Sequence, residues 1–498
     1  MKTHLTRFFL LLISAPLFSQ SFPWASQGGG SGNDAGYGIS HDANGNTYVA
    51  GSYSATATFG SFTLSGNNGS FSNAFVAKYD ASGNVVWAKK GGTPNKNDGA
   101  YAIATDAAGN SYVTGYFQDT AAFGAFTLIS SGMEDVFVVK YDMNGNELWA
   151  KRFGNTGSEF GYGIGIDGSG NCYVTDNIFM ITKYNTNGAL QWTFTVSGQR
   201  TIHGIRTDNA GNSYITGTYT NTLYVGTYTL LNSGGTDIFV AKISPVGSVL
   251  WASRLGGAGD DDGRAIQLDA QNNIYLAGFM NNPGGQAFIT KIYASGNNGW
   301  MRTASGTNAA YGLGTDSYGN SVMTGFISSN STFGNFNLSD VNTSDLFIAQ
   351  YDSAGNCRWA MNTGGASMNQ GYGVTLDDQC HARITGYFET GATFGTNNLS
   401  AGGQGNEVFV VLSDNNCATG IMEEKNNEVT VIPNPTNGVI TLPHAEGEVF
   451  IYDILGNEII YSRINGNSSF DLSSFPPGIY ILKVQNGVKY SVRRVVKQ

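Results

Sequence analysis

The sequence has few charged side chains, and basic residues are the scarcer kind. Asp, Glu, Lys and Arg make up 12% of the 498 residues, about half the usual share, and the formal net charge is −10. Because no basic stripe is available to neutralise phosphates, nucleic acid is excluded as a partner. Hydrophobic residues still reach 41% and aromatic residues 12%, which is enough for a packed core and argues against disorder.

The chain also lacks an apolar run that could comfortably span a bilayer. Its N-terminus carries Lys2 and Arg7, the short apolar run Phe8–Phe18, and the small residue Ser19. This order predicts a secretory signal peptide over residues 1–19, and nothing later resembles a membrane helix. We therefore expect an exported protein without a transmembrane segment.

Tryptophan is present in a regular phrase. Each copy is followed within a few residues by glycine, as in Trp87-Ala88-Lys89-Lys90-Gly91-Gly92, and successive copies lie roughly 43 to 63 residues apart. A period in this range indicates an array in which each repeat is one small sheet. The tryptophans are Trp24, Trp87, Trp149, Trp192, Trp251, Trp300 and Trp359.

The second repeat shows four short segments rich in alternating or β-branched residues, at 101–105, 111–115, 136–141 and 147–150. Asp-x-x-Gly-Asn turns join the first segment to the second and the third to the fourth. Four antiparallel strands per unit predict an all-β fold, a seven-bladed β-propeller. The units begin near Asn33, Asp98, Ser158, Arg200, Asp260, Thr307 and Ser367.

The last unit ends after its third strand, at Phe409 to Leu412, and has no tryptophan strand. Residues Phe22 to Ala25, conversely, form a fourth strand with no unit before it. We expect the N-terminal strand to close the last blade and so to remove the open edges of the ring. First strands that alternate large and small residues, as in Tyr37-Gly38-Ile39, are expected to be innermost, with the tryptophans packed between blades near the rim.

The two faces of such a ring differ. The repetitive turns emerge on one face, whereas the insertions between second and third strands and the crossovers between units emerge on the other. These insertions vary in length and composition, and units three and five lack the long form. Because variable loops on a rigid frame often carry function, we expect a binding site on this second face.

The phrases Asp-x-x-Gly-Asn-x-Tyr-Val-x-Gly and Phe-Val-x-Lys-Tyr-Asp, followed by Trp-Ala, resemble bacterial SBBP-type β-propeller repeats over roughly residues 22 to 413. That resemblance implies a fold and is nearly silent about activity.

The tail contains three motifs: the run from Val431 to Gly438, the stretch from Val449 to Glu458, and Phe475-Pro476-Pro477-Gly478-Ile479-Tyr480. In this order the motifs resemble the C-terminal type A sorting domain of the type IX secretion system of Bacteroidetes. The resemblance implies outer-membrane translocation by that machinery, cleavage of the tail, and release or attachment at the cell surface. We predict a signal peptide at 1–19, a propeller at 20–414, a linker at 415–428 and a small β-sandwich sorting domain at 429–498. The motif residues it points to are Pro433, Asn434, Pro435, Gly438, Gly478 and Tyr480.

One candidate ligand site stands at the channel mouth. The column of large residues that begins the first strands contains tyrosine in five units, but His203 in unit four and Arg264 in unit five. The acidic run Asp260, Asp261 and Asp262 precedes Arg264. This set could bind a polar ligand or perform acid–base chemistry, and the alternative is ordinary substitution at the rim beside a solvated acidic loop.

Other chemistry has little support. The stretches that begin at Asp42 and Asp142 resemble the start of a calcium loop, but the twelfth positions hold Tyr53 and Phe153, which cannot supply the bidentate carboxylate. We expect no metal and no cofactor, and no phosphate loop, nucleophile elbow or haem motif is present. His41 and His381 are interpreted as surface histidines near the repetitive face.

The four cysteines include one candidate disulfide pair. Cys380 follows a turn in the last unit and Cys417 lies in that unit's truncated final turn, so a disulfide between them is predicted. Cys357 is a rival partner, and free thiols are the alternative.

Together these observations predict a monomeric, noncatalytic scaffold, secreted or displayed at the outer cell surface, that binds a glycan, a peptide or a surface partner. A propeller hydrolase or lyase with its site at the channel mouth is the alternative, and a purely structural surface component is a third possibility. Neither the ligand nor the choice between tethering and release follows from the sequence.

Overall fold

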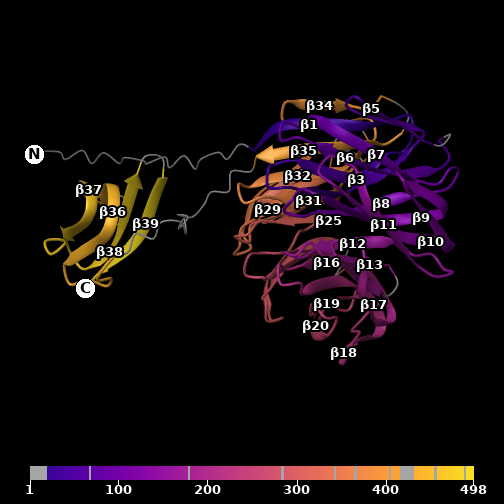
Figure 1. Ribbon diagram of the computed structural model, residues 1–498. Helices are drawn as coiled ribbons and strands as arrows, with labels where there is room; N and C mark the ends of the chain where they lie inside the picture. The colour runs from indigo at the N-terminus through magenta and orange to yellow at the C-terminus, as the bar shows by residue number, and fades with distance from the viewer. Residues whose placement is uncertain are drawn as a thin grey trace, which may run out of the picture. The chain divides into compact units, whose positions relative to one another are not determined.

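The computed structural model describes residues 20–66, 69–177, 180–281, 285–340, 344–363, 367–402, 405–414, 431–453, 457–486 and 489–498. The predicted signal peptide and the predicted linker lie outside the described residues. The chain divides into two compact units, Met1–Asn416 and Cys417–Gln498. All regular elements in the described ranges are strands, which confirms the all-β prediction (Figure 1).

Strand pairing organises the described part of the first unit into seven antiparallel groups of four, each running from an inner to an outer strand. The first two groups are β2 (Ala35–His41), β3 (Thr47–Ser54), β6 (Ser72–Tyr79) and β7 (Val85–Gly92), then β8 (Gly99–Thr105), β9 (Ser111–Phe123), β10 (Phe126–Tyr141) and β11 (Glu147–Phe153). The next two are β12 (Gly161–Ile166), β13 (Cys172–Asp176), β14 (Met180–Tyr184) and β15 (Leu190–Thr195), then β16 (Ser197–Thr207), β17 (Ser213–Val225), β19 (Asp237–Ile243) and β20 (Val249–Leu255). The last three are β21 (Asp261–Leu268), β22 (Ile274–Met280), β23 (Gln286–Ile292) and β24 (Asn298–Thr303); β25 (Asn308–Thr315), β26 (Ser321–Ile327), β29 (Asp345–Tyr351) and β30 (Cys357–Thr363); and β31 (Asn369–Leu376), β32 (His381–Phe388), β35 (Glu407–Asp414) and β1 (Ser21–Gly30).

The groups form a closed ring, so the propeller prediction is confirmed. Each inner strand contacts the inner strand of the next group, and β31 returns to β2. The closing pair is the predicted one: β1 lies antiparallel to β35, with Trp24 opposite Leu412 and Gly28 opposite Val408 (Figure 1). The strand β1, although it comes first in the described chain, is therefore the outer strand of the last group. It covers the edge of β35 that would otherwise be open.

The tryptophans pack between neighbouring groups, as expected. The Trp24 indole Nε1 donates a hydrogen bond to Ala81 O of the next group at 3.0 Å, and Trp149 donates to Thr186 O at 3.0 Å. Each of these carbonyls lies in a turn whose glycine has positive φ, and the indole lies against that glycine, as with Trp24 and Gly83. A side chain at Gly83 would collide with the ring, so the turn and the tryptophan require each other.

The insertions between second and third strands are more regular than the sequence suggested. In five groups they form a tight hairpin, and in two of these the hairpin pairs with the outer strand of the preceding group: Phe59 lies opposite Gly28, and Phe123 opposite Gly91. Groups three and five lack this hairpin among the described residues, in keeping with the short insertions expected there. The separate hairpin strands are β4 (Thr56–Phe59), β5 (Phe62–Ser65), β18 (Tyr228–Leu231), β27 (Ser331–Phe333), β28 (Phe336–Leu338), β33 (Gly391–Phe394) and β34 (Asn397–Ser400).

The size of one outer-strand residue follows the presence of this hairpin. Where the next group has a hairpin, the residue four positions after the tryptophan has a small or β-branched side chain. These residues are Gly28, Gly91, Val196, Ala304 and Thr363. Where groups three and five lack the hairpin, the preceding outer strands carry Phe153 and Leu255 instead. Either the hairpin or a large outer-strand side chain thus fills the same space, as close packing requires.

The second unit is a small sheet in the order β37-β36-β38-β39. Its described residues form a separate small β domain, as expected, and the long strand β36 pairs on both of its sides, which joins all four strands in one sheet. Ile440, Val449, Ile451 and Leu482 are buried in its core. The strands are β36 (Val439–Tyr452), β37 (Glu458–Asp471), β38 (Gly478–Asn486) and β39 (Lys489–Lys497).

Candidate functional site

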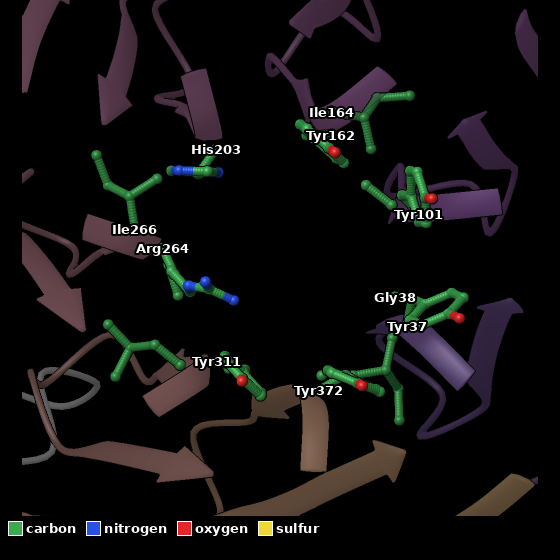
Figure 2. Close-up of a pocket in the computed structure, with 18 of the residues that line it drawn as sticks. Tyr37, Gly38, Tyr101, Tyr162, Ile164, His203, Arg264, Ile266, Tyr311 and Tyr372 are labelled. Atoms are coloured by element: carbon green, nitrogen blue, oxygen red, sulfur yellow. The ribbon is translucent and has the colours of Figure 1, made fainter. Parts of the chain in front are cut away.

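The column of large residues forms a ring around the channel axis (Figure 2). In every inner strand the pairing register shifts at this residue, as between Gly36 and Gly38 around Tyr37, so each is the extra residue of a β-bulge. A bulge re-aims its side chain, and here it turns the side chain toward the axis instead of toward a neighbouring blade. The sequence identified the column, but its alternation did not reveal the bulge. The ring consists of Tyr37, Tyr101, Tyr162, His203, Arg264, Tyr311 and Tyr372.

Most neighbours in the ring touch each other through aromatic faces and edges. Ring centroids are 5.4 Å apart for Tyr37 and Tyr101, 5.2 Å for Tyr101 and Tyr162, and 5.2 Å for Tyr37 and Tyr372. Tyr311 follows Tyr372 at 5.4 Å. These tyrosines present a continuous aromatic collar with hydroxyl groups, the mixed surface that polar ligands with apolar faces use.

His203, Arg264 and Asp262 complete the ring as one charged cluster. Asp262 Oδ1 lies 3.1 Å from His203 Nε2, and Asp262 Oδ2 accepts a hydrogen bond from Arg264 Nε at 2.8 Å. Burial alone would raise the pKa of Asp262, but contact with His203 and Arg264 holds it below its ordinary value. The Arg264 guanidinium also lies 4.6 Å from the centroid of Tyr311, a cation–π contact. The structure thus brings together three of the five predicted ligand residues.

Asp260 and Asp261 are held elsewhere. Asp261 is buried and accepts hydrogen bonds from Gly257 N at 2.7 Å and Asn281 N at 3.2 Å. Asp260 accepts one from Thr236 N at 2.9 Å. Both carboxylates therefore fasten loop backbone rather than join the ring, and the acidic run does not act as a cluster.

Asp261 belongs to a repeated position three residues before the ring residue. Its counterpart Asp98 is fully buried and accepts hydrogen bonds from Thr93 N at 2.5 Å and Gln118 N at 3.0 Å. Asp34 stands in the same place in the first group and binds Gly30 N and Ser54 N. Burial, which outweighs these hydrogen bonds, raises the pKa of both Asp34 and Asp98 to about 7.

This burial predicts a pH dependence of stability. An unfolded aspartate ionises near pH 3.8, so between about 4 and 7 the folded chain binds more protons at Asp98, and stability falls as pH rises through 7. The full contribution of one such group is about 4 kcal/mol by linkage. We expect Asp98→Asn to flatten this decline, measured as the free energy of unfolding at pH 4.5, 6 and 8. Asp142→Asn, at an exposed turn, serves as the control, and parallel curves for Asp98→Asn and the natural protein would contradict the assignment.

A second aromatic layer around the ring was missed by sequence reasoning. Tyr116 lies 5.4 Å from Tyr101, Phe326 lies 5.5 Å from Tyr311, and Tyr387 lies 5.9 Å from Tyr372. All three outer residues directly follow the glycine of a second strand, as in Gly115-Tyr116. That glycine was the available signal, but only the register places the next residue beside the collar.

The cavity inside the ring is narrow and has a charged residue along its wall. Its volume is about 170 Å³, and Arg206 and Gln267 line it together with the ring. Arg206 Nε donates to Gln267 Oε1 at 2.7 Å, and its Nη1 donates to Ile205 O at 3.1 Å and to Ile164 O at 3.4 Å. Burial lowers the pKa of Arg206 to about 10, so the guanidinium stays charged at neutral pH. The sequence pattern gave no hint of this residue.

The two histidines of the repetitive face differ. His41 Nδ1 lies 2.8 Å from Thr375 Oγ1, and burial, assisted by Arg383, lowers the pKa of His41 to about 4, so it is not the surface residue that was expected. His381 Nδ1 lies 3.2 Å from Asp377 Oδ2 and is partly exposed. The carboxylate of Asp42 accepts hydrogen bonds from its own turn, from Asn44 N at 2.9 Å and Asn46 N at 3.0 Å.

The structure excludes the alternative disulfide between Cys357 and Cys380. Cys357 and Cys172 are free thiols, so Cys357 is not the partner of Cys380. Cys380 is disulfide-bonded. Cys417 lies outside the described residues, and the predicted Cys380–Cys417 pair stays a prediction.

The sorting-motif residues hold the second unit together. Asn434, between Pro433 and Pro435, donates from Nδ2 to Arg494 O at 2.6 Å and accepts from Val496 N at 2.9 Å, which ties the motif to β39. Gly438 O accepts from Leu472 N at 2.7 Å. Tyr480, two residues after Gly478, is buried and donates its hydroxyl to Pro476 O at 2.7 Å.

Sequence and structure comparisons find proteins to which the chain is weakly similar. An uncharacterized WD repeat-containing protein of Acanthamoeba polyphaga mimivirus is 24% identical over 441 residues, which cover 62% of this chain. The matched part is 31% of that protein, so the chain spans about a third of its length. The WD40 repeats of RRP9 are 8% identical, with a TM-score of 0.48, over 79% of this chain and all of that one. The dihydro-heme d1 dehydrogenase NirN is 10% identical, with a TM-score of 0.37, over 80% of this chain and 73% of that one.

The tail gives a more definite result. Residues 430–498 match the family described as "Secretion system C-terminal sorting domain". The described ranges contain no helix long and apolar enough to cross a membrane. The chain is therefore a β-propeller protein with a C-terminal sorting domain of the type IX secretion system, which directs it to the cell surface or into the medium.

Proposed function

We propose that the propeller is a noncatalytic binding module and that its ligand enters the channel mouth through the aromatic collar. The observation that carries this proposal is the ring itself: five tyrosines, His203 and Arg264, each turned toward the axis by a bulge, with Asp262 in contact with the last two. A cavity of about 170 Å³ is smaller than the pockets of roughly 300 to 1,000 Å³ that take drug-sized molecules. It therefore suits one small polar unit, such as the end of a longer chain.

Replacement of a collar tyrosine tests this proposal. We expect Tyr101→Ala to weaken ligand binding about tenfold or more, because it removes an aromatic face at the centre of the site. The measurement is retention on a glycan array, followed by calorimetric titration of the retained sugar. Tyr318→Ala, at an exposed turn after β25, is the matched control. Equal loss in both variants, or none in either, would contradict a site at the collar.

A catalytic role has one observation in its favour. His203 lies within 3.1 Å of a carboxylate that could orient it as a base, and Arg264 beside it could stabilise developing negative charge. A hydrolase or lyase would lose turnover in His203→Ala while keeping its melting temperature. A binding module would show no turnover of the retained ligand in either form of the protein, and product analysis by mass spectrometry distinguishes the two.

A further inference from the structure

Arg206 is a half-buried cation in the channel wall, and it lacks a carboxylate partner among the described residues. None of the described acidic side chains lies within ion-pair distance of its guanidinium, whose hydrogen bonds go to neutral oxygens of Gln267, Ile164 and Ile205. Arg383, which is buried elsewhere in the propeller, is paired with a carboxylate: its Nη1 lies 2.9 Å from Asp377 Oδ2. A charge that is partly withdrawn from water is more stable when it is paired, so the charge of Arg206 leaves room for an anion in the channel.

The guanidinium has a free donor toward the cavity. Nε and Nη1 of Arg206 are used by protein acceptors, whereas Nη2 donates to no acceptor among the described residues, and Arg206 lines the channel cavity. Arg206 follows the ring residue His203 by three positions on β16, which corresponds to about 10 Å along an extended strand. Arg206 and the collar line the same cavity, so the far end of a unit seated against the collar points toward Arg206.

The wall between the collar and Arg206 is polar for a structural reason. Each of the seven inner strands pairs on one side only among the described residues, so the N–H and C=O groups of its other edge face the axis. These backbone groups need hydrogen-bond partners, which water or a ligand rich in hydroxyl groups can supply. A sugar meets this demand, whereas an apolar ligand would leave these groups unpaired.

We propose that the channel binds a hexuronic acid unit at the end of a glycan. Its carboxylate pairs with Arg206, its hydroxyls bond to the strand edges and to the tyrosine hydroxyls, and its C–H face packs on the collar. An Arg–carboxylate pair is charge-assisted and stronger than a neutral hydrogen bond. This inference rests on the proposed function and names the ligand class for the same site.

Titration calorimetry of the full secreted chain tests the inference. The probes are the methyl glycosides of glucuronic and galacturonic acid, their uronamides, and the neutral hexosides. We expect one uronate to bind about ten- to a hundredfold more tightly than its amide. Arg206→Gln should remove that preference, while Arg302→Gln should keep it, because Arg302 lies outside the channel, where its Nε donates to Gly355 O.

The outcomes separate the two proposals. Equal affinity for uronate and uronamide overturns the role of Arg206, and this comparison needs no variant, so it holds even if Arg206→Gln does not fold. Tyr101-dependent binding of neutral hexosides alone would overturn the uronate while leaving the binding module intact. Binding of a short peptide that depends on its free C-terminal carboxylate, in place of the uronates, would overturn the sugar assignment. Absence of binding by any probe or array glycan overturns both proposals.

Discussion

Deletion of residues 20–27 should remove most of the stability of the ring. The deletion takes away the pairing of Trp24, Ala25, Ser26 and Gln27 with β35, and it removes the buried side chain of Phe22. Loss of a buried phenylalanine costs about 3 to 5 kcal/mol, and each lost hydrogen bond about 1 kcal/mol. Their sum approaches the 5 to 15 kcal/mol that stabilises a typical domain. We expect the deleted protein to be unfolded or aggregated near 37 °C, measured by circular dichroism and size-exclusion chromatography.

A complementation experiment provides the control. A synthetic peptide of residues 20–30 should restore a cooperative melting transition, because β35 then regains its partner and Ala81 O its indole donor. A deleted protein that melts like the natural one would show that β1 does not close the ring. The intact chain with Ser26→Ala should melt normally, because that change keeps the strand and both of its large side chains.

Gly91→Leu in the outer strand β7 should be strongly destabilising. A Cβ at Gly91 would overlap the ring of Phe123, which lies opposite it in the hairpin of the next group. Overpacking of this kind costs roughly 3 kcal/mol, and the hairpin would also lose its pairing with β7. We expect the melting temperature to fall by about 5 °C or more.

The same substitution offers an internal rescue. The outer strand β20 carries Leu255 at the position of Gly91, and the next group there has no hairpin. The double variant Gly91→Leu with Phe123→Ala should therefore be more stable than the sum of its single changes predicts, by about 1 kcal/mol or more in a double-mutant cycle. Simple additivity would show that the two residues do not share one space.

Much of the fold could be predicted because the same strand and turn pattern recurs in every repeat. The Asp-x-x-Gly-Asn turns fix each hairpin through a positive φ, as at Gly109, and the missing last strand pointed to Trp24 as its replacement. The hairpin insertions were less visible. Their turn reads Phe-Gly-x-Phe in three units, as at Phe59 to Phe62, but Val-Gly-x-Tyr or Phe-Gly-x-Asn in the other two, so the insertions looked variable.

The candidate site was predicted in part. His203 and Arg264 stood out because they interrupt a column of tyrosines, and the structure joins both through Asp262. Asp260 and Asp261 could not be separated from Asp262 by sequence, because three adjacent carboxylates read alike until hydrogen-bond partners are known. Arg206 carried no signal at all, since one arginine in an inner strand looks the same whether it faces a carboxylate or an empty channel.

The sequence by itself determined the strands, their turns, the order of the units and the sorting tail, because these depend on local backbone preference and on repetition. Only the tertiary structure decided which side chains reach the axis. A one-residue bulge turns Tyr37 and its counterparts away from the alternating pattern, and a bulge is a property of the pairing between two strands. The tertiary structure likewise decides that Arg206 faces a channel bounded by seven inner strands, where none of the described carboxylates pairs with it.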